Sequence, residues 1–122
     1  MTNQPANFFS EILLRIYPCK TPFRLKILHK KPKTLMGSYT WSTQVIRIYD
    51  GWGDTQVCTE TAIHEYAHHL HQTEFGKEKY RQKPHGKQFW QIYGQLMQRA
   101  KDLGLYDDPT NPVLDFPSNQ SL

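Results

Sequence analysis

The most informative segment for the fold is Thr61-Ala62-Ile63-His64-Glu65-Tyr66-Ala67-His68-His69-Leu70-His71. It contains no glycine or proline, and its apolar residues recur at intervals of three and four, which is typical of a helix. Asp54 or Thr55 is a suitable N-cap for this helix. The sequence therefore predicts a long helix from that cap to about Thr73, followed by a lysine-rich polar segment.

Two histidines of this helix are spaced to share a metal ion. His64 and His68 are four residues apart, so both imidazole rings lie on one helix face. Glu65 then lies beside the ion without binding it, where a carboxylate can accept a proton from water. The alternative is a polar helix face exposed to solvent, but the small and apolar residues around the motif favour the metal site.

A catalytic zinc site needs a third protein ligand and an open position for water. His85 is the favoured candidate, because it begins the next predicted helix, where a chain reversal would bring it over the first helix. The neighbouring Gly86 has no side chain to obstruct that approach. Glu74 and Glu78 are the alternative ligands.

The remaining histidines of the helix are assigned other places. His71 is about 10.5 Å from His64 along the axis, at about 1.5 Å per residue, so the two cannot bind the same ion. His71 is therefore predicted behind the ligands or at the surface, and His69 is predicted to point elsewhere.

The rest of the chain predicts an α+β domain. Periodicity and turn residues predict, in order, a helix over 7–17, strands over 23–29, 37–41 and 44–49, the histidine helix, and a helix over 85–103. The second and third strands read as a hairpin, so we expect a small three-stranded antiparallel sheet. Residues 1–122 form one domain in this interpretation, with 106–122 as an irregular tail and Gly104 ending the last helix.

The net charge, the cysteine content and the hydropathy of the chain indicate possible partners and the cellular compartment. The 122 residues carry a net charge of +4, which permits contact with nucleic acid without requiring it. Cys19 and Cys58 form no CxxC pair and are predicted to be free, buried thiols in a reducing compartment. No signal peptide or membrane helix is evident, so a cytoplasmic location is expected.

Basic residues gather in two places along the chain. One group is a candidate for nucleic-acid contact and consists of Lys77, Lys79, Arg81, Lys83 and Lys87; the other consists of Lys26, Lys30, Lys31 and Lys33. Phosphate binding by either group would depend strongly on salt. Both groups are equally consistent with solvated faces of the protein.

Four segments together resemble one family, the SprT-like metallopeptidases. They are Gly37-Ser38-Tyr39, Val45-Ile46-Arg47-Ile48, 61–68 and His85-Gly86-Lys87-Gln88-Phe89-Trp90, within a resemblance that covers residues 8–105. The resemblance implies a minimal gluzincin-like (zincin-like) fold, one Zn²⁺ bound by His64, His68 and His85, and Glu65 as catalytic base. The YgjP-like family has a similar His-x-x-x-Phe-Trp ending and ranks behind it.

The function expected from these features is zinc-dependent hydrolysis of peptide bonds in a protein or peptide substrate, which could include DNA-associated proteins. Many SprT-like proteins carry a C-terminal cysteine zinc ribbon, and this chain has no cysteine there. An extended substrate is expected to add along the edge of the 37–49 hairpin. Two alternatives remain open at this point: a zinc site that only stabilises the fold, and a nucleic-acid-binding module.

Overall fold

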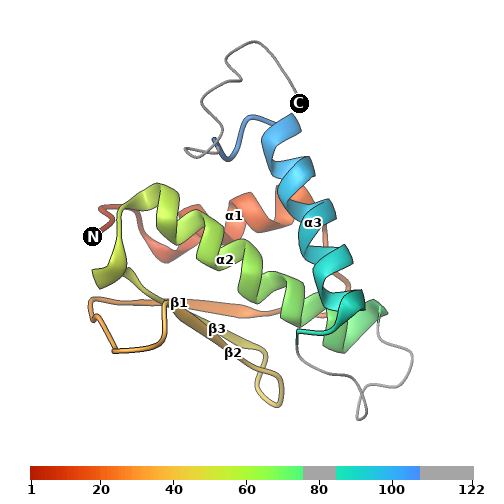
Figure 1. Ribbon diagram of the computed structural model, residues 1–122, viewed down its shortest axis with the longest axis horizontal. Helices are drawn as coiled ribbons and strands as arrows, with labels where there is room; N and C mark the ends of the chain where they lie inside the picture. Colours follow the sequence, from red (N-terminus) through yellow and green to blue (C-terminus); the bar gives the residue numbers. More distant parts are fainter. Residues whose placement is uncertain (76–84, 108–122) are drawn as a thin grey trace.

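The computed structural model describes residues 1–75 and 85–107 and confirms the α+β class. Its elements, labelled in Figure 1, are α1 (Ala6–Ile16), β1 (Arg24–Leu28), β2 (Gly37–Thr40), β3 (Val45–Tyr49), the short helix η1 (Asp50–Trp52), α2 (Thr55–Leu70), the π-helical turn η2 (His71–Phe75) and α3 (Lys87–Asp102). The alternative ligand Glu78, the basic residues Lys77, Lys79, Arg81 and Lys83, and the tail from 108 onward lie outside the described residues.

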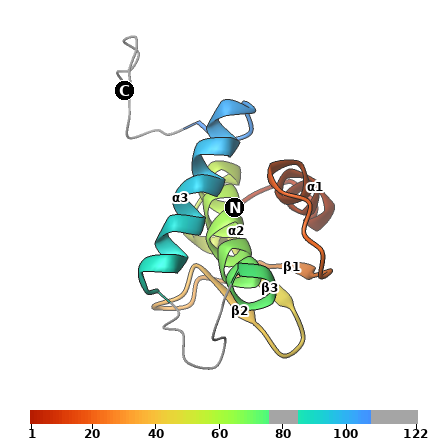
Figure 2. The same cartoon turned by 90° about the vertical axis from the view of Figure 1, so that its right-hand side faces the viewer.

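The helices and the sheet form two layers. Figures 1 and 2 show α1 and α2 over the same face of the sheet, with α3 packed beside α2. The far end of α3 also meets the end of α1, where the Arg99 side chain donates to the carbonyl of Ile16 at 2.6 Å. The core lies between these layers and includes Phe9, Leu13, Ile46, Ile63 and Phe89, none of which has exposed surface. Burial of such apolar side chains is the main force that holds the layers together.

The sheet is mixed, so the prediction of an antiparallel sheet was wrong. β3 occupies the centre, with β2 antiparallel on one side and β1 parallel on the other. The β2–β3 hairpin itself was predicted correctly. β3 is the most buried strand, and the central position covers its backbone on both sides. β1 and β3 are neighbours in the sheet, but β2 lies between them in the sequence and no tight turn joins them. The local sequence therefore does not set the direction of that pair.

α2 runs through the middle of the domain, as its sequence predicts. The side chain of Asp54 accepts a hydrogen bond of 3.2 Å from the backbone N–H of Val57, which confirms the predicted N-cap. The α-helix ends at Leu70, and η2 continues the coil to Phe75, close to the predicted end. Tyr66 is fully buried, and its hydroxyl donates to the carbonyl of Tyr17.

The two outer helices differ from expectation in detail. α1 begins at Ala6, with Pro5 at the N-cap position, and ends at Ile16, so both ends lie one residue before the predicted bounds of 7–17. α3 ends as predicted, with Gly104 at a φ of 71° that favours glycine. Trp90, next to the buried Phe89 on α3, is 49% exposed. No helix within 1–75 or 85–107 has the length and apolar character needed to cross a membrane.

Both cysteines are free thiols, as predicted. Cys58 is buried in the core, where desolvation raises the pKa of its thiol to about 11. Cys19 is half-buried, so only one of the two occupies the core position expected of both.

Candidate metal centre

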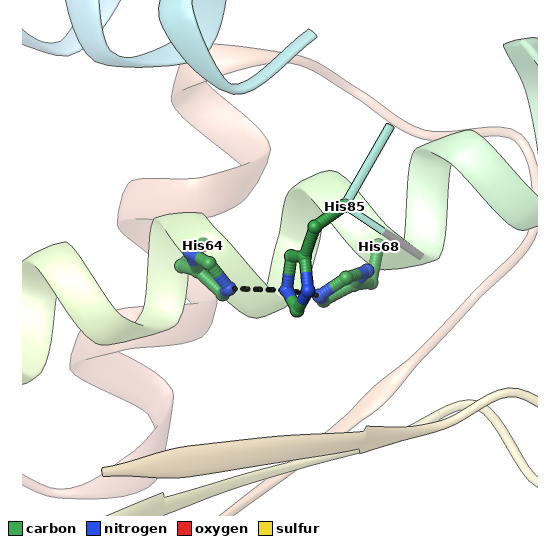
Figure 3. A group of neighbouring side chains, drawn as sticks. All are labelled: His64, His68 and His85. Carbon is green, nitrogen blue, oxygen red and sulfur yellow. Dashed lines mark hydrogen bonds between the residues drawn. The ribbon is translucent and has the colours of Figure 1, made fainter. Parts of the chain in front are cut away.

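Three histidine side chains meet above the middle of α2. His64 and His68 lie one turn apart on that helix, and His85 approaches from the residues that precede α3 (Figure 3). The Nε2 atom of His85 is 3.3 Å from Nε2 of His64 and 3.1 Å from Nε2 of His68. Within the described part of the chain, these residues form a cluster whose ligand atoms all lie within 4.8 Å of one another.

The donor set and its spacing fit a zinc ion. Imidazole nitrogens lie about 2.0–2.1 Å from zinc, and tetrahedral angles then place two such nitrogens about 3.3 Å apart. The two measured nitrogen separations, 3.3 and 3.1 Å, are close to that value. Three imidazole nitrogens directed at one point are the donor set that zinc sites commonly use, so the arrangement suits a metal ion.

Burial keeps the two helix histidines in the neutral form that binds metals. Desolvation, together with the neighbouring histidines, lowers the pKa of His68 to about 3. Desolvation and His85 also lower the pKa of His64, against an opposing effect of Glu60. Neutral imidazole is the ligand form, so neither side chain has to lose a proton near neutral pH before it binds.

α3 supports the cluster through Phe89. This ring is fully buried and stacks on His68, with the ring centroids 4.3 Å apart. It also contacts His64 and His85 edge-on, at centroid distances of 5.1 Å each. One aromatic side chain at the start of α3 therefore orients all three imidazoles and ties the position of His85 to the core.

Glu65 lies next to the cluster in a dry environment. The residue is 7% exposed, and this burial raises the pKa of its carboxyl group to about 7. A carboxyl group with a pKa near the working pH is suited to accept and return a proton. Burial by its neighbours therefore gives Glu65 the raised pKa that suits a general base, the role that the motif predicts for it.

β2 approaches α2 very closely beside Glu65. A Cβ atom added to Gly37 would lie 2.5 Å from Cγ2 of Thr61 and 3.3 Å from Cγ of Glu65. Such separations leave no room for any side chain at position 37. The absence of a side chain therefore allows the edge strand of the sheet to form one wall of the metal site.

The cluster opens into a cleft of about 470 Å³ between β2, α2 and the start of α3. Gly37 and Ser38 line one wall, the three histidines and Glu65 line the floor, and Tyr93 lies on the opposite side. A site that is open on one side leaves space for water and substrate beside three protein ligands, which is typical of catalytic metal sites.

The other candidates from the sequence lie outside the cluster. His69 is fully buried and points away from it, with Nδ1 2.8 Å from the Tyr39 hydroxyl and Nε2 2.7 Å from the carbonyl of Thr21. His71 is also buried, so the alternative of a surface position was wrong. Glu74 lies outside the cluster, where its carboxylate accepts hydrogen bonds from the Tyr17 hydroxyl and the backbone N–H of Lys20.

Sequence reasoning missed several residues that line the cleft, among them Glu60 and Tyr93. Glu60 precedes His64 by four residues, so the same spacing that identified the ligands also places Glu60 on their helix face. Tyr93 lies on α3, and no spacing within one helix relates it to the residues of α2. It reaches the cleft because α3 crosses α2 there.

Comparison of the chain with models of protein families, with curated proteins and with solved structures finds no match. The three histidines and the buried Glu65 in the cleft are therefore the features that indicate a function.

Proposed function

We propose that this protein is a zinc-dependent metallopeptidase of the SprT-like kind with a zincin-like fold. The observation that carries the proposal is the convergence of His64, His68 and His85 beside the buried carboxyl group of Glu65 in an open cleft. A zinc site that only stabilises a fold is normally closed by a fourth protein ligand and has no use for a buried acid beside it. This combination favours a catalytic site over a purely structural one.

In this proposal the three histidines hold one Zn²⁺. When bound, the ion acts as a Lewis acid on water and on the carbonyl oxygen of a peptide bond. Glu65 accepts a proton from the water whose oxygen forms the new bond to the carbonyl carbon. Glu65 then gives that proton to the nitrogen as the carbon–nitrogen bond breaks, so the products are a carboxylic acid and an amine.

The substrate is proposed to bind as an extended strand along β2. β2 is an edge strand, since it pairs only with β3 within the described sheet, and its first two residues line the cleft. Unpaired backbone groups of an edge strand can bind an extended peptide by main-chain hydrogen bonds. A protein or peptide is therefore the substrate class that fits the cleft.

Contact with DNA, and action on DNA-associated proteins, remain predictions. Lys26, Lys30, Lys33 and Lys87 are exposed, as a phosphate contact requires. Lys31 is also exposed, and its ammonium group lies 4.8 Å from the centre of the Trp52 ring. Exposure of lysines is equally common in proteins that bind no nucleic acid, so these residues add no second function to the proposal.

The deciding experiment compares the zinc-loaded protein with its Glu65→Gln variant on unfolded β-casein. The variant should keep one zinc per chain and lose hydrolysis by about 10²–10⁴-fold, the usual contribution of a general base. Glu11→Gln, on the exposed side of α1, is the matched control and should cleave normally. Undiminished cleavage by Glu65→Gln, or the same zinc affinity in His85→Ala as in the wild type, would contradict the assignment.

A further inference from the structure

One end of the cleft carries a second carboxylate, Glu60, one turn before His64 on α2. Its two oxygens accept hydrogen bonds from two tyrosine hydroxyls, Tyr106 at 3.0 Å and Tyr93 at 3.4 Å. Tyr106 is buried, so it holds one side of the carboxylate in place from within the protein. The structure therefore orients Glu60 instead of leaving it free to turn in solvent.

Glu60 places a negative charge at the cleft of a protein whose net charge is positive. The protein has a net charge of +4, yet the cleft lining within residues 1–75 and 85–107 includes two glutamates, Glu60 and Glu65, and no lysine or arginine. Glu60 is exposed, and it forms no ion pair with a lysine or arginine in the parts of the chain that the structure describes. Its charge is thus available to a ligand that enters the cleft.

Apolar side chains also line the cleft near this charge, beside the polar side chains of Thr34 and Thr61. Leu35 and Met36 are 45% and 44% exposed and line the cleft together with Val57. A surface of this kind fits a side chain with an aliphatic stem and a positive end, because the stem covers the apolar wall while the charge reaches the carboxylate. Lysine and arginine are the residues with that shape.

The direction of the strands decides which substrate residue would lie there. Gly37 packs on Thr61 and Glu65, and two residues later the Tyr39 hydroxyl contacts His69, so β2 and α2 run in the same direction. A peptide that pairs antiparallel to β2, the more stable arrangement, therefore runs from the His68 end of the cleft toward Glu60. The residue after the bond to be cut then lies at the Glu60 end.

We propose that Glu60, with Leu35, Met36 and Val57, forms a specificity subsite that selects lysine or arginine immediately after the scissile bond. This inference rests on the proposed peptidase function, because that function defines the scissile bond. Glu60 takes no part in the chemical step. It acts on the choice of substrate through charge, and the apolar wall acts through contact with the aliphatic stem.

A matched pair of zinc-binding probes tests the subsite by equilibrium binding, independently of turnover. Both are succinyl hydroxamate peptides, whose hydroxamate anchors them at the metal and whose next side chain is either aminobutyl, as in lysine, or butyl, as in norleucine. The zinc-loaded wild type and Glu11→Gln should bind the aminobutyl probe about fivefold more tightly, as expected for a partly exposed ion pair. Glu60→Gln should bind both probes equally, and added salt should reduce the wild-type preference.

Equal affinity of the wild type for the two probes, or an undiminished preference in Glu60→Gln, would overturn the subsite and leave the proposed peptidase function intact. The converse result is also distinct. If the wild type prefers the aminobutyl probe but cleaves no casein, the subsite stands as a cation-selective pocket and the proposed hydrolysis fails. Circular dichroism of Glu60→Gln confirms that the variant is folded before binding is compared.

Discussion

Replacement of Gly37 by alanine tests the packing on which the cleft depends. The new methyl carbon would lie 2.5 Å from Cγ2 of Thr61 and 2.9 Å from the carbonyl oxygen of Arg47. Carbon atoms in contact are normally about 3.5–4.0 Å apart, so the overlap with Thr61 is about 1 Å. β2 must then move away from α2, or the side chain of Thr61 must leave its rotamer.

The expected loss of stability follows from that overlap. Extra methyl groups forced into a packed interior typically cost about 1–3 kcal/mol. For a domain of this size, 1 kcal/mol corresponds to about 4 °C in melting temperature, so Gly37→Ala should lower Tm by about 4–12 °C. Hydrolysis should also fall, because a displaced β2 no longer forms the wall beside Glu65.

The assay is thermal unfolding followed by circular dichroism, with a control and a rescue. Gly94→Ala, in the exposed middle of α3 with no atom within 4 Å of the new carbon, should stabilise the protein by about 0.5–1 kcal/mol. Thr61→Ser removes Cγ2 and keeps the hydroxyl that donates to the carbonyl of Val57 at 2.9 Å. Combined with Gly37→Ala, it should recover about 1 kcal/mol relative to additivity. A neutral Gly37→Ala, or strictly additive variants, would refute this account of the strand–helix contact.

Three further predictions concern the ionisable and polar groups near the cleft. In the metal-free protein, burial raises the Glu65 pKa from 4.5 to about 7, so its contribution to stability is fully present below pH 4.5 and is lost as pH rises toward 7. The difference in unfolding free energy between wild type and Glu65→Gln, measured by urea titration, should therefore shift against the wild type over that interval, and a constant difference would contradict the burial of this group. Tyr39→Phe removes the donor to Nδ1 of buried His69 and should cost about 1–3 kcal/mol by the same titration, whereas an unchanged stability would show that this hydrogen bond is not formed. Zinc at 1,000 times its dissociation constant should stabilise the wild type by about 4 kcal/mol, and His85→Ala should lose most of this gain in a thermal-shift measurement if the third ligand is correctly assigned.

The local features of the site, namely its helix, the cap of that helix and the spacing of two ligands, could be predicted from the sequence. The spacing of His64 and His68, with Glu65 after the first, depends only on helix geometry, and the Asp54 cap and Gly104 end depend on single residues. The pairing of His85 with the helix motif was also predicted, through the resemblance of four separate segments. The helix, its cap and its spacing could be predicted because that information lies within a few residues of each position, whereas the place of His85 depended on the resemblance.

Contacts between segments far apart in the sequence became known only from the tertiary structure. β1 pairs with β3 in parallel because the hairpin places β3 in the centre, and no turn in the sequence specifies that arrangement. Burial by β2 gives Glu65 its raised pKa, and the hydroxyls of Tyr93 and Tyr106 orient Glu60 from outside its own helix. Such contacts join residues more than 20 positions apart on different elements, so periodicity and spacing, which report on one element at a time, cannot reveal them.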